Sequence, residues 1–315
     1  MLTLRSSEDH YGDVQRLVAL AVAGSRRAWS KLDLADLDAS FRTTVGPELL
    51  LLVGGAQTAA ASLAEPYVDR VLVEQNFGDD GKAGVLVPQA FAGVASDGRP
   101  LPSLLRSPLT DAKTLAGQGV ADPVQAARPA VDRIVATQVQ DAARGGESAV
   151  IASRTKVGGY VRQLNPPSCS RCAILAGKWF RWNTGFQRHP QCDCVHVPVA
   201  EDAAGELTTN PRTYFDSLTP AEQDRIFTKS GAQAIRDGAD IGQVVNARRG
   251  MSVSQPLRGA KVTSEGVTYR GYANQAPGST VGRRGGVRLM PETIYEVAVD
   301  RADAVRLLRA NGYLR

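Results

Sequence analysis

The sequence predicts an α+β protein with a mainly helical N-terminal region, a zinc-knuckle β-hairpin and a small, basic α/β C-terminal region. Three features predict this class. Apolar residues recur at helical spacing in the first half of the chain, strand-forming residues flank a cluster of cysteines, and glycine and arginine gather near the C-terminus. A chain of 315 residues, 43% of them hydrophobic, can bury one large core or several smaller ones. Disorder throughout is therefore excluded.

Residues 1–120 are predicted to form a helical N-terminal region with a loop-rich insertion. Apolar side chains between Tyr11 and Val22 lie three and four positions apart, as on a helix with one buried face. A second helix is expected from about Gln57 to Glu74. Residues 76–120 contain glycines and prolines among short apolar pieces, which favours loops and turns over a continuous element.

Residues 121–200 are predicted to form a core of one helix followed by the knuckle. Asp122 and Pro123 suit the N-cap and the first position of a helix, and Gly145-Gly146 is expected to end it, with a short helix to follow. Lys178–Thr184 and Cys192–Val199 are rich in aromatic and β-branched residues. These two pieces predict a small two-stranded unit.

Two further segments complete the predicted organisation, a capped helical segment at 201–250 and a basic Gly/Arg-rich arm with a small α/β end at 251–315. The sequence Thr219-Pro-Ala-Glu222 is a capping box that begins a helix, and Gly238 is expected to close it. Ile294–Val299 is strand-like. Arg301–Ala310 should form the last helix.

All four cysteines fall within one short window, which is the pattern of a metal site. Cys169 and Cys172 form a C-x2-C pair, and His189, Cys192 and Cys194 follow as H-P-x-C-x-C. A tetrahedral zinc ion needs four such ligands, so five residues compete for four places. We expect Cys169, Cys172, Cys192 and either His189 or Cys194 to bind a structural zinc ion, with the fifth side chain contacting a ligand.

The rival interpretation of the cysteines is a pair of disulfides, which would suit an oxidising compartment. The first ten residues carry early charges and no apolar signal region, so the sequence predicts a soluble protein made in the cytoplasm, where thiols stay reduced. Its longest aliphatic stretch, Leu49–Val53, is far too short to span a bilayer, and no membrane partner is expected.

Positive charge is concentrated near the C-terminus. Between residues 246 and 290, eight basic side chains stand against the single acid Glu265, a net +7, whereas the whole chain carries +5. This stretch is expected to contact either DNA, without sequence preference, or an acidic patch on a partner protein. The basic residues are Arg248, Arg249, Arg258, Lys261, Arg270, Arg283, Arg284 and Arg288.

The run from Asn165 to Val199, with Cys-Ser-Arg-Cys, Gly177-Lys-Trp-Phe and His-Pro-Gln-Cys-Asp-Cys, resembles the signature of the Mu F-like phage head-morphogenesis (minor capsid) family. The capped helix and Asp240–Arg249 resemble the downstream part of such head proteins in phages of actinobacteria. The resemblance implies a minor structural head protein that assembles with the portal and other head proteins, in the host cytoplasm, and is retained in the virion. It implies no enzymatic turnover. The chain departs from the family pattern at Asp193, where a basic residue is usual.

A head maturation protease acting on scaffold or capsid protein is the alternative function. A protease needs a nucleophile with a positioned base, and the chain lacks a G-x-S-x-G elbow. His196 is the remaining histidine near the knuckle, and its position two residues after Cys194 fits a sheet histidine or a partner of a metal ligand better than a general base. We therefore expect a structural protein, with Ser168 or His196 as the positions at which the protease alternative is tested.

Overall fold

The computed structural model describes residues 4–184, 194–199, 203–268, 271–275, 279 and 286–314. It divides into two compact units, Met1–Asn165 with Lys178–Thr208, and Pro166–Gly177 with Thr209–Arg315. About 62% of the described residues are helical, and the described residues form two small three-stranded antiparallel sheets, which confirms the α+β class. The predicted organisation of the chain into four segments, with boundaries at residues 120, 200 and 250, stays a prediction.

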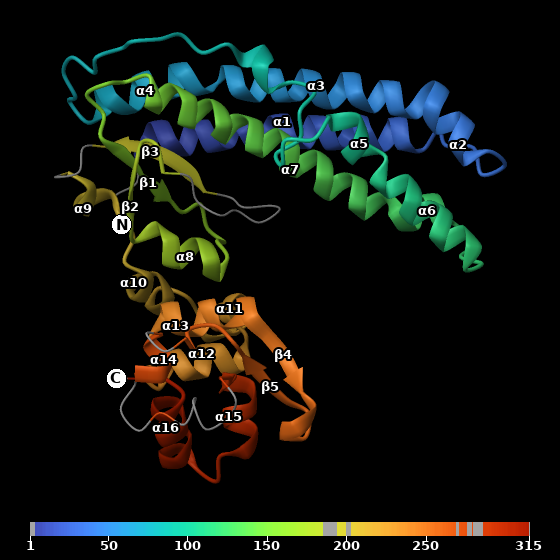
Figure 1. The fold of residues 1–315 in the computed structure, drawn as a ribbon. Helices are drawn as coiled ribbons and strands as arrows, with labels where there is room; N and C mark the ends of the chain where they lie inside the picture. Colours follow the sequence, from blue (N-terminus) through green and yellow to red (C-terminus); the bar gives the residue numbers. More distant parts are fainter. Residues whose placement is uncertain are drawn as a thin grey trace. The chain divides into compact units, whose positions relative to one another are not determined.

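The first unit is a bundle of long helices with a sheet under one end (Figure 1). Helix α1 confirms the first predicted helix, and its buried face carries Val14, Val18 and Ala21 at the expected spacing. The predicted helix at 57–74 is instead two helices that meet at Leu63. The elements of this unit are α1 (Arg5–Trp29), α2 (Leu37–Ser40), a π-helical turn (Phe41–Val45), α3 (Gly46–Ser62), α4 (Ala64–Glu74), a 3-10 turn (Pro88–Phe91), α5 (Leu101–Leu105), α6 (Ser107–Gly117), α7 (Pro123–Ala152), β1 (Gly159–Gln163), β2 (Trp179–Arg181), β3 (Val195–Val199) and α9 (Ala204–Leu207).

The prediction of loops throughout 76–120 is wrong for its second half, where α5 and α6 are helical. Pro102 and Pro108 lie in the first turn of α5 and α6, where a helix has no use for the missing N–H group. Leu101, Leu105 and Leu109 are buried against the bundle. The prolines begin helices here rather than breaking them.

Helix α7 runs for 30 residues through Gly145-Gly146, so the prediction that it ends there is wrong. A Cβ atom on Gly146 would lie 3.0 Å from the Ala61 carbonyl oxygen and 3.0 Å from Ala64 Cβ. A Cβ on Gly145 would lie 2.7 Å from the ring of Phe91. These glycines let neighbouring segments approach the helix closely, and the hydrogen bonds of α7 continue past them.

Gly146→Ala is accordingly expected to lower the free energy of unfolding by about 1–3 kcal/mol, because the added methyl group overpacks the contact with the α3–α4 junction. The matched control is Gly55→Ala, at an exposed position of α3 where a Cβ meets nothing within 4 Å. That change should stabilise the protein by about 0.5–1 kcal/mol, since alanine favours the helix over glycine. Chemical denaturation measures both, and equal effects at the two sites would contradict the packing argument.

The sheet of the first unit has the order β2-β1-β3, and all its pairs are antiparallel. The predicted two-stranded unit is therefore wrong, since β1 lies between the two predicted strands, at residues where a short helix was expected. β1 is buried at all five positions, and Arg162 on it lies opposite His196 on β3. The strand carries a buried charge in its middle, so its apolar pattern is interrupted and hard to recognise.

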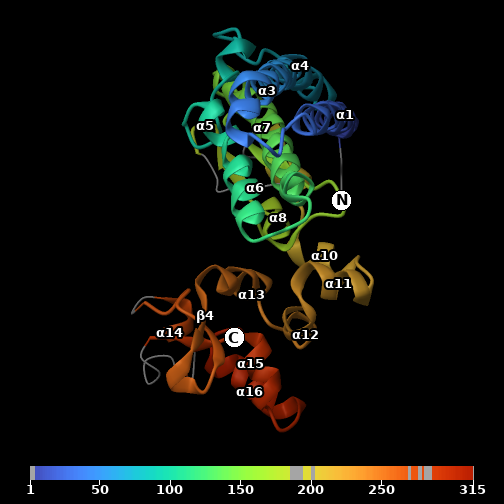
Figure 2. The ribbon, with the colours of Figure 1, turned by 90° about the vertical axis from the view of Figure 1, so that its right-hand side faces the viewer.

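The second unit packs short helices around a small sheet of order β4-β5-β6 (Figure 2). The capping box at Thr219 and Glu222 is present, but the predicted helix is divided at Thr228, whose φ of 67° interrupts it. The elements are α8 (Ser170–Ala176), α10 (Pro211–Asp216), α11 (Pro220–Phe227), α12 (Lys229–Arg236), α13 (Ile241–Ala247), a 3-10 turn (Arg248–Gly250), β4 (Met251–Ser254), a 3-10 turn (Gln255–Leu257), β5 (Ala260–Thr263), α14 (Tyr272–Gln275), β6 (Arg288–Leu289), α15 (Pro291–Val297) and α16 (Arg301–Ala310).

The C-terminal end of the second unit corrects one prediction and confirms another. The strand expected at 294–299 is wrong, because these residues complete and follow α15, which begins with Pro291 at its first turn. Helix α16 has the predicted bounds, and the Asp300 side chain caps it by accepting the N–H of Asp303. Among the described residues, no helix is both long enough and apolar enough to cross a membrane.

Candidate functional site

Two of the predicted metal ligands lie on the first turn of α8 in the second unit. Cys169 is the N-cap of this helix, and its Sγ accepts the N–H of Cys172 at 3.4 Å. Residues three positions apart share one side of a helical turn, so both sulfurs belong to the same side of α8. The Tyr214 hydroxyl donates to the Ser168 carbonyl at 2.9 Å and accepts the Ser168 N–H at 3.1 Å, which fixes the backbone just before the pair.

The remaining predicted ligands are less completely placed. His189 and Cys192 lie outside the described residues, and within the described ranges no group of three or more His, Cys, Asp or Glu side chains is gathered as a metal site. Cys194 belongs to the first unit, is 1% exposed and directly precedes β3. The structure thus brings Cys169 and Cys172 together on one helical turn.

Two buried arginines hold Cys194. Arg162 on β1 donates to its Sγ from Nε at 3.2 Å and from Nη2 at 2.7 Å. Arg144 on α7 donates from Nε to its carbonyl oxygen at 3.0 Å. Charged N–H donors aimed at sulfur are contacts that a metal-bound thiolate accepts from surrounding side chains. The same contacts also suit the alternative in which Cys194 is the fifth, non-ligating residue, so both arrangements stay open.

Next to Cys194, Glu147 is the centre of a buried polar cluster in the first unit. Its side chain is 1% exposed, its Oε1 lies 2.8 Å from His10 Nε2, and its Oε2 accepts the backbone N–H of His196 at 3.0 Å. Burial alone would raise the pKa of Glu147, but the hydrogen bond from His10 and the charge of His196 lower the pKa to about 2. Glu147 is therefore a buried carboxylate that joins α7 to α1 and β3.

Tyr67 on α4 completes the cluster. Its hydroxyl donates to the His196 carbonyl at 2.8 Å and lies 3.1 Å from Ser7 Oγ, while its ring stacks on His10 with centroids 4.0 Å apart. Burial and the charge of Glu147 raise the pKa of Tyr67 well above its usual value, so the hydroxyl keeps its proton. We define the buried polar cluster as Ser7, His10, Tyr67, Glu147 and His196, contributed by α1, α4, α7 and β3.

Most of this cluster was not predicted from the sequence, although a signal was present. His10 stands four residues before Val14 on the buried face of α1. Glu147 continues the stripe of Val135, Val139 and Ala143 on α7. A charged or polar residue in the middle of an apolar stripe predicts a buried partner, because such a group is costly to bury alone.

The contacts of His196 bear on the protease alternative. Ser148 Oγ lies 3.3 Å from His196 Nδ1, and Glu147 Oε2 lies 3.5 Å from the same nitrogen. In a catalytic triad the nucleophile and the acid contact opposite ring nitrogens, so that the histidine can take the proton of one while the other holds its orientation. The arrangement around His196 therefore matches a buried structural histidine better than a general base.

The predicted basic contact residues are divided by the fold. Arg248, Arg249, Arg258 and Lys261 are exposed around β4 and β5, and Arg248 forms an ion pair with Glu292 at 2.8 Å. Arg288 is 0% exposed, its guanidinium stacks on Tyr313, and it donates to the Asn311 carbonyl, so it is not available for an external contact. The three other predicted contact residues lie outside the described residues: Arg270, Arg283 and Arg284.

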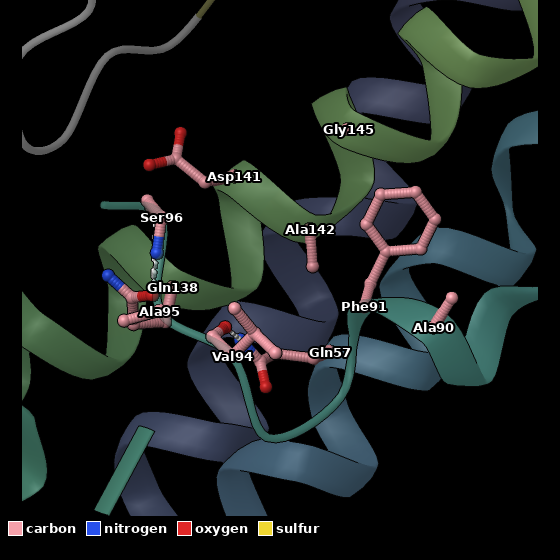
Figure 3. Close-up of a pocket in the computed structure, with 10 residues that line it drawn as sticks. All are labelled: Gln57, Ala90, Phe91, Val94, Ala95, Ser96, Gln138, Asp141, Ala142 and Gly145. Atoms are coloured by element: carbon pink, nitrogen blue, oxygen red, sulfur yellow. Dashed lines mark hydrogen bonds between the residues drawn. The ribbon is translucent and has the colours of Figure 1, made fainter. Parts of the chain in front are cut away.

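A pocket of about 220 Å³ lies in the first unit between α3, α7 and the segment at 90–96 (Figure 3). The Gln57 side chain bonds to the Gly93 N–H and the Val94 carbonyl, and Gln138 Oε1 accepts the N–H and the hydroxyl of Ser96. The carboxamide groups of these two glutamines therefore hold the 93–96 segment against the helices. We assign this pocket to packing of the connection between α4 and α5.

The contacts described so far are of two kinds, a cysteine pair suited to metal binding and a buried cluster that fastens a strand to helices. Neither kind by itself identifies a protein family. The chain matches no protein-family model, no curated protein and no solved structure.

Proposed function

We propose that this chain is a structural minor head protein of a tailed phage, of the Mu F-like head-morphogenesis type, and that it folds around a structural zinc ion. The observation that carries the proposal is the C-x2-C pair on the first turn of α8, within the segment whose sequence resembles that family. Two sulfurs on one side of a helical turn are suited to bind one metal ion. The head-protein role is proposed from the sequence resemblance, and the cysteine pair is the structural observation that supports the zinc site.

The zinc site would use Cys169, Cys172 and Cys192, with His189 or Cys194 as the fourth ligand. When four protein ligands close the shell, the ion contributes a cross-link between distant chain segments and leaves no position for a reacting water. Arg162 is compatible with either choice of fourth ligand, because its two N–H groups could donate to the Cys194 sulfur whether that sulfur binds zinc or lies beside a ligand.

The interior of the first unit also favours a structural role. Glu147, His10 and His196 are each about 1% exposed or less, and the contacts between them join helices to a strand. The second candidate, a head maturation protease acting on scaffold or capsid protein, would rely on the contact between Ser148 and His196. Ser148 and Glu147 lie at the same ring nitrogen of His196, whereas a triad places its serine and its acid at opposite ring nitrogens, so we rank this candidate lower.

We place the protein in the virion, in the capsid interior or at the portal vertex, after assembly in the host cytoplasm. Its partners would be the portal and other head proteins, with packaged DNA as a further, non-specific partner. The exposed Arg248, Arg249, Arg258 and Lys261 support contacts with a negatively charged partner, whether phosphate or carboxylate.

Purified virions of the phage that encodes this chain are expected to contain it, and it should co-purify with the portal from lysed heads. Mass spectrometry of banded particles measures the first, and affinity purification with tagged portal measures the second. Absence from the particle would contradict the head-protein role. Cleavage of a scaffold or capsid protein that stops in a Ser148→Ala variant would instead support the protease candidate.

A further inference from the structure

The outer edge of the sheet β4-β5-β6 is open on one side. β4 pairs with β5 from Met251 opposite Thr263 to Ser254 opposite Ala260. In the part of the chain that the structure describes, no strand pairs with the other side of β4. An edge strand presents a row of N–H and C=O groups that can pair with another extended chain.

The backbone contacts show which groups face outward. The Gly250 carbonyl accepts the N–H of Ser264 at 3.3 Å, and the Ser254 carbonyl accepts the N–H of Gly259 at 3.0 Å, so these residues face β5. Hydrogen bonds alternate along an antiparallel strand. The N–H and C=O groups of Met251 and Val253 therefore point away from β5, toward the open edge.

The side chains of the same two residues are apolar and exposed. Met251 is 44% exposed and Val253 is 59% exposed, and as residues two apart on a strand they lie on one face. Native edge strands are usually protected by charges, prolines or short length, because an exposed apolar edge invites pairing. The four residues of β4 leave room for one short added strand.

Positive charge surrounds this edge. Arg249 lies two residues before β4, Arg258 lies in the turn before β5, and Lys261 stands opposite Val253. All three are exposed, and none forms an ion pair with a carboxylate of the described residues. A second copy of the chain would bring like charges together at such an edge, which disfavours self-pairing. An acidic partner would instead be attracted by these positive charges.

We propose that the β4 edge binds an extended, acidic segment of a partner protein by strand addition, with Met251 and Val253 supplying apolar contact and Arg249, Arg258 and Lys261 pairing with its carboxylates. The site deepens the partner contact proposed above, but it requires only an acidic strand and does not rest on the partner being a head protein. DNA is the less suitable ligand. A phosphate group gains no favourable contact from the outward carbonyl groups or from the exposed apolar side chains, whereas an added strand would contact both.

The test uses the full chain and a short, capped peptide of alternating valine and glutamate. A peptide of the same length with lysine in place of glutamate is the control. Binding is followed by fluorescence anisotropy, and amide hydrogen exchange is followed at Met251 and Val253. We expect the acidic peptide to bind and to slow exchange at both amides, while the lysine peptide does neither. Absence of binding by the acidic peptide would overturn the proposal.

Two variants separate strand addition from simple charge attraction. Val253→Pro removes an outward N–H that β5 does not use, so the fold should persist while peptide affinity falls by at least about tenfold. Arg249→Glu with Lys261→Glu should weaken binding by at least about tenfold at low salt, whereas Arg225→Glu, an exposed arginine on α11, should change it little.

A short DNA duplex serves as the competing probe. If the duplex binds more tightly than the acidic peptide, and Val253→Pro leaves that binding unchanged while the double charge reversal removes it, the edge is a phosphate-binding surface and the proposal is overturned. The outcome does not decide whether the chain is a head protein, which the presence or absence of the polypeptide in virions decides separately.

Discussion

Glu147→Ala is expected to lower the free energy of unfolding by about 3–5 kcal/mol, one of the two largest effects that the structure predicts. The change leaves His10 Nε2 and the backbone N–H of His196 buried without their carboxylate partner. A buried polar group that loses its partner retains the full cost of leaving water. Urea denaturation followed by circular dichroism measures the loss.

Two controls test whether the loss comes from the cluster. Glu147→Gln keeps an oxygen acceptor for the His196 N–H but removes the negative charge, so its cost should be smaller than that of the alanine variant. Asp111→Ala removes an exposed carboxylate of α6 and should change stability by no more than about 0.5 kcal/mol. If Glu147→Ala behaves like Asp111→Ala, the cluster does not stabilise the fold as described.

The same residue predicts a pH dependence. The pKa of Glu147 is lowered by folding, so the unfolded chain binds its proton first as the pH falls. The stabilisation from Glu147 is therefore fully present above the unfolded pKa of about 4.3 and is lost as the pH falls through the folded pKa. The stability difference between wild type and Glu147→Gln should shrink between about pH 5 and pH 2, and a constant difference would contradict the assignment.

Local signals in the sequence predicted the beginnings of elements well. Asp122, Thr219 and Asp300 each accept a backbone N–H at the start of the helix expected there. A cap is a contact between residues three apart, so it depends little on the rest of the fold. The stripe that predicted α1 is likewise local, because its spacing alone decides which face is buried.

Features that depend on distant contacts were not predictable in the same way. Gly145-Gly146 resembles a helix end, but its role is set by Ala61 and Phe91, which are distant in sequence. β1 was missed because Arg162 interrupts its apolar pattern, and Arg162 is accommodated by Cys194, which lies 32 residues away in the chain. Tertiary contacts overrode local preference in both cases.

The candidate site also combines local features, which were predictable from the sequence, with distant contacts, which were not. Cysteine spacing predicted that Cys169 and Cys172 would act together, and a helical turn brings them to one side of α8. The partners of Glu147 are His10 on α1, 137 residues before it, and His196 on β3, 49 residues after it, and no short pattern joins residue 10 to residue 147. Only the interrupted stripes on α1 and α7 indicated that a buried polar contact was needed.

Cys172→Ala is expected to abolish zinc binding and to expose residues 169–199 to proteolysis, the second large effect. A structural zinc site contributes binding free energy of about 10–16 kcal/mol in small zinc domains, and that free energy stabilises the folded segment. Wild-type protein should therefore carry zinc by elemental analysis, and removal of the metal with a chelator should reproduce the variant's sensitivity to protease. Ser170→Ala, on the same turn of α8, should retain the metal.

The variant alone is not decisive, because Cys172 is 1% exposed and its loss also removes packing. Zinc content and chelation separate the two effects, since packing does not respond to a chelator. Zinc-free wild-type protein that keeps its protease resistance would contradict the metal site. If zinc is present, comparing His189→Ala with Cys194→Ala identifies the fourth ligand, because only the loss of a ligand lowers metal affinity by many orders of magnitude, whereas loss of a supporting contact costs about 10–100-fold.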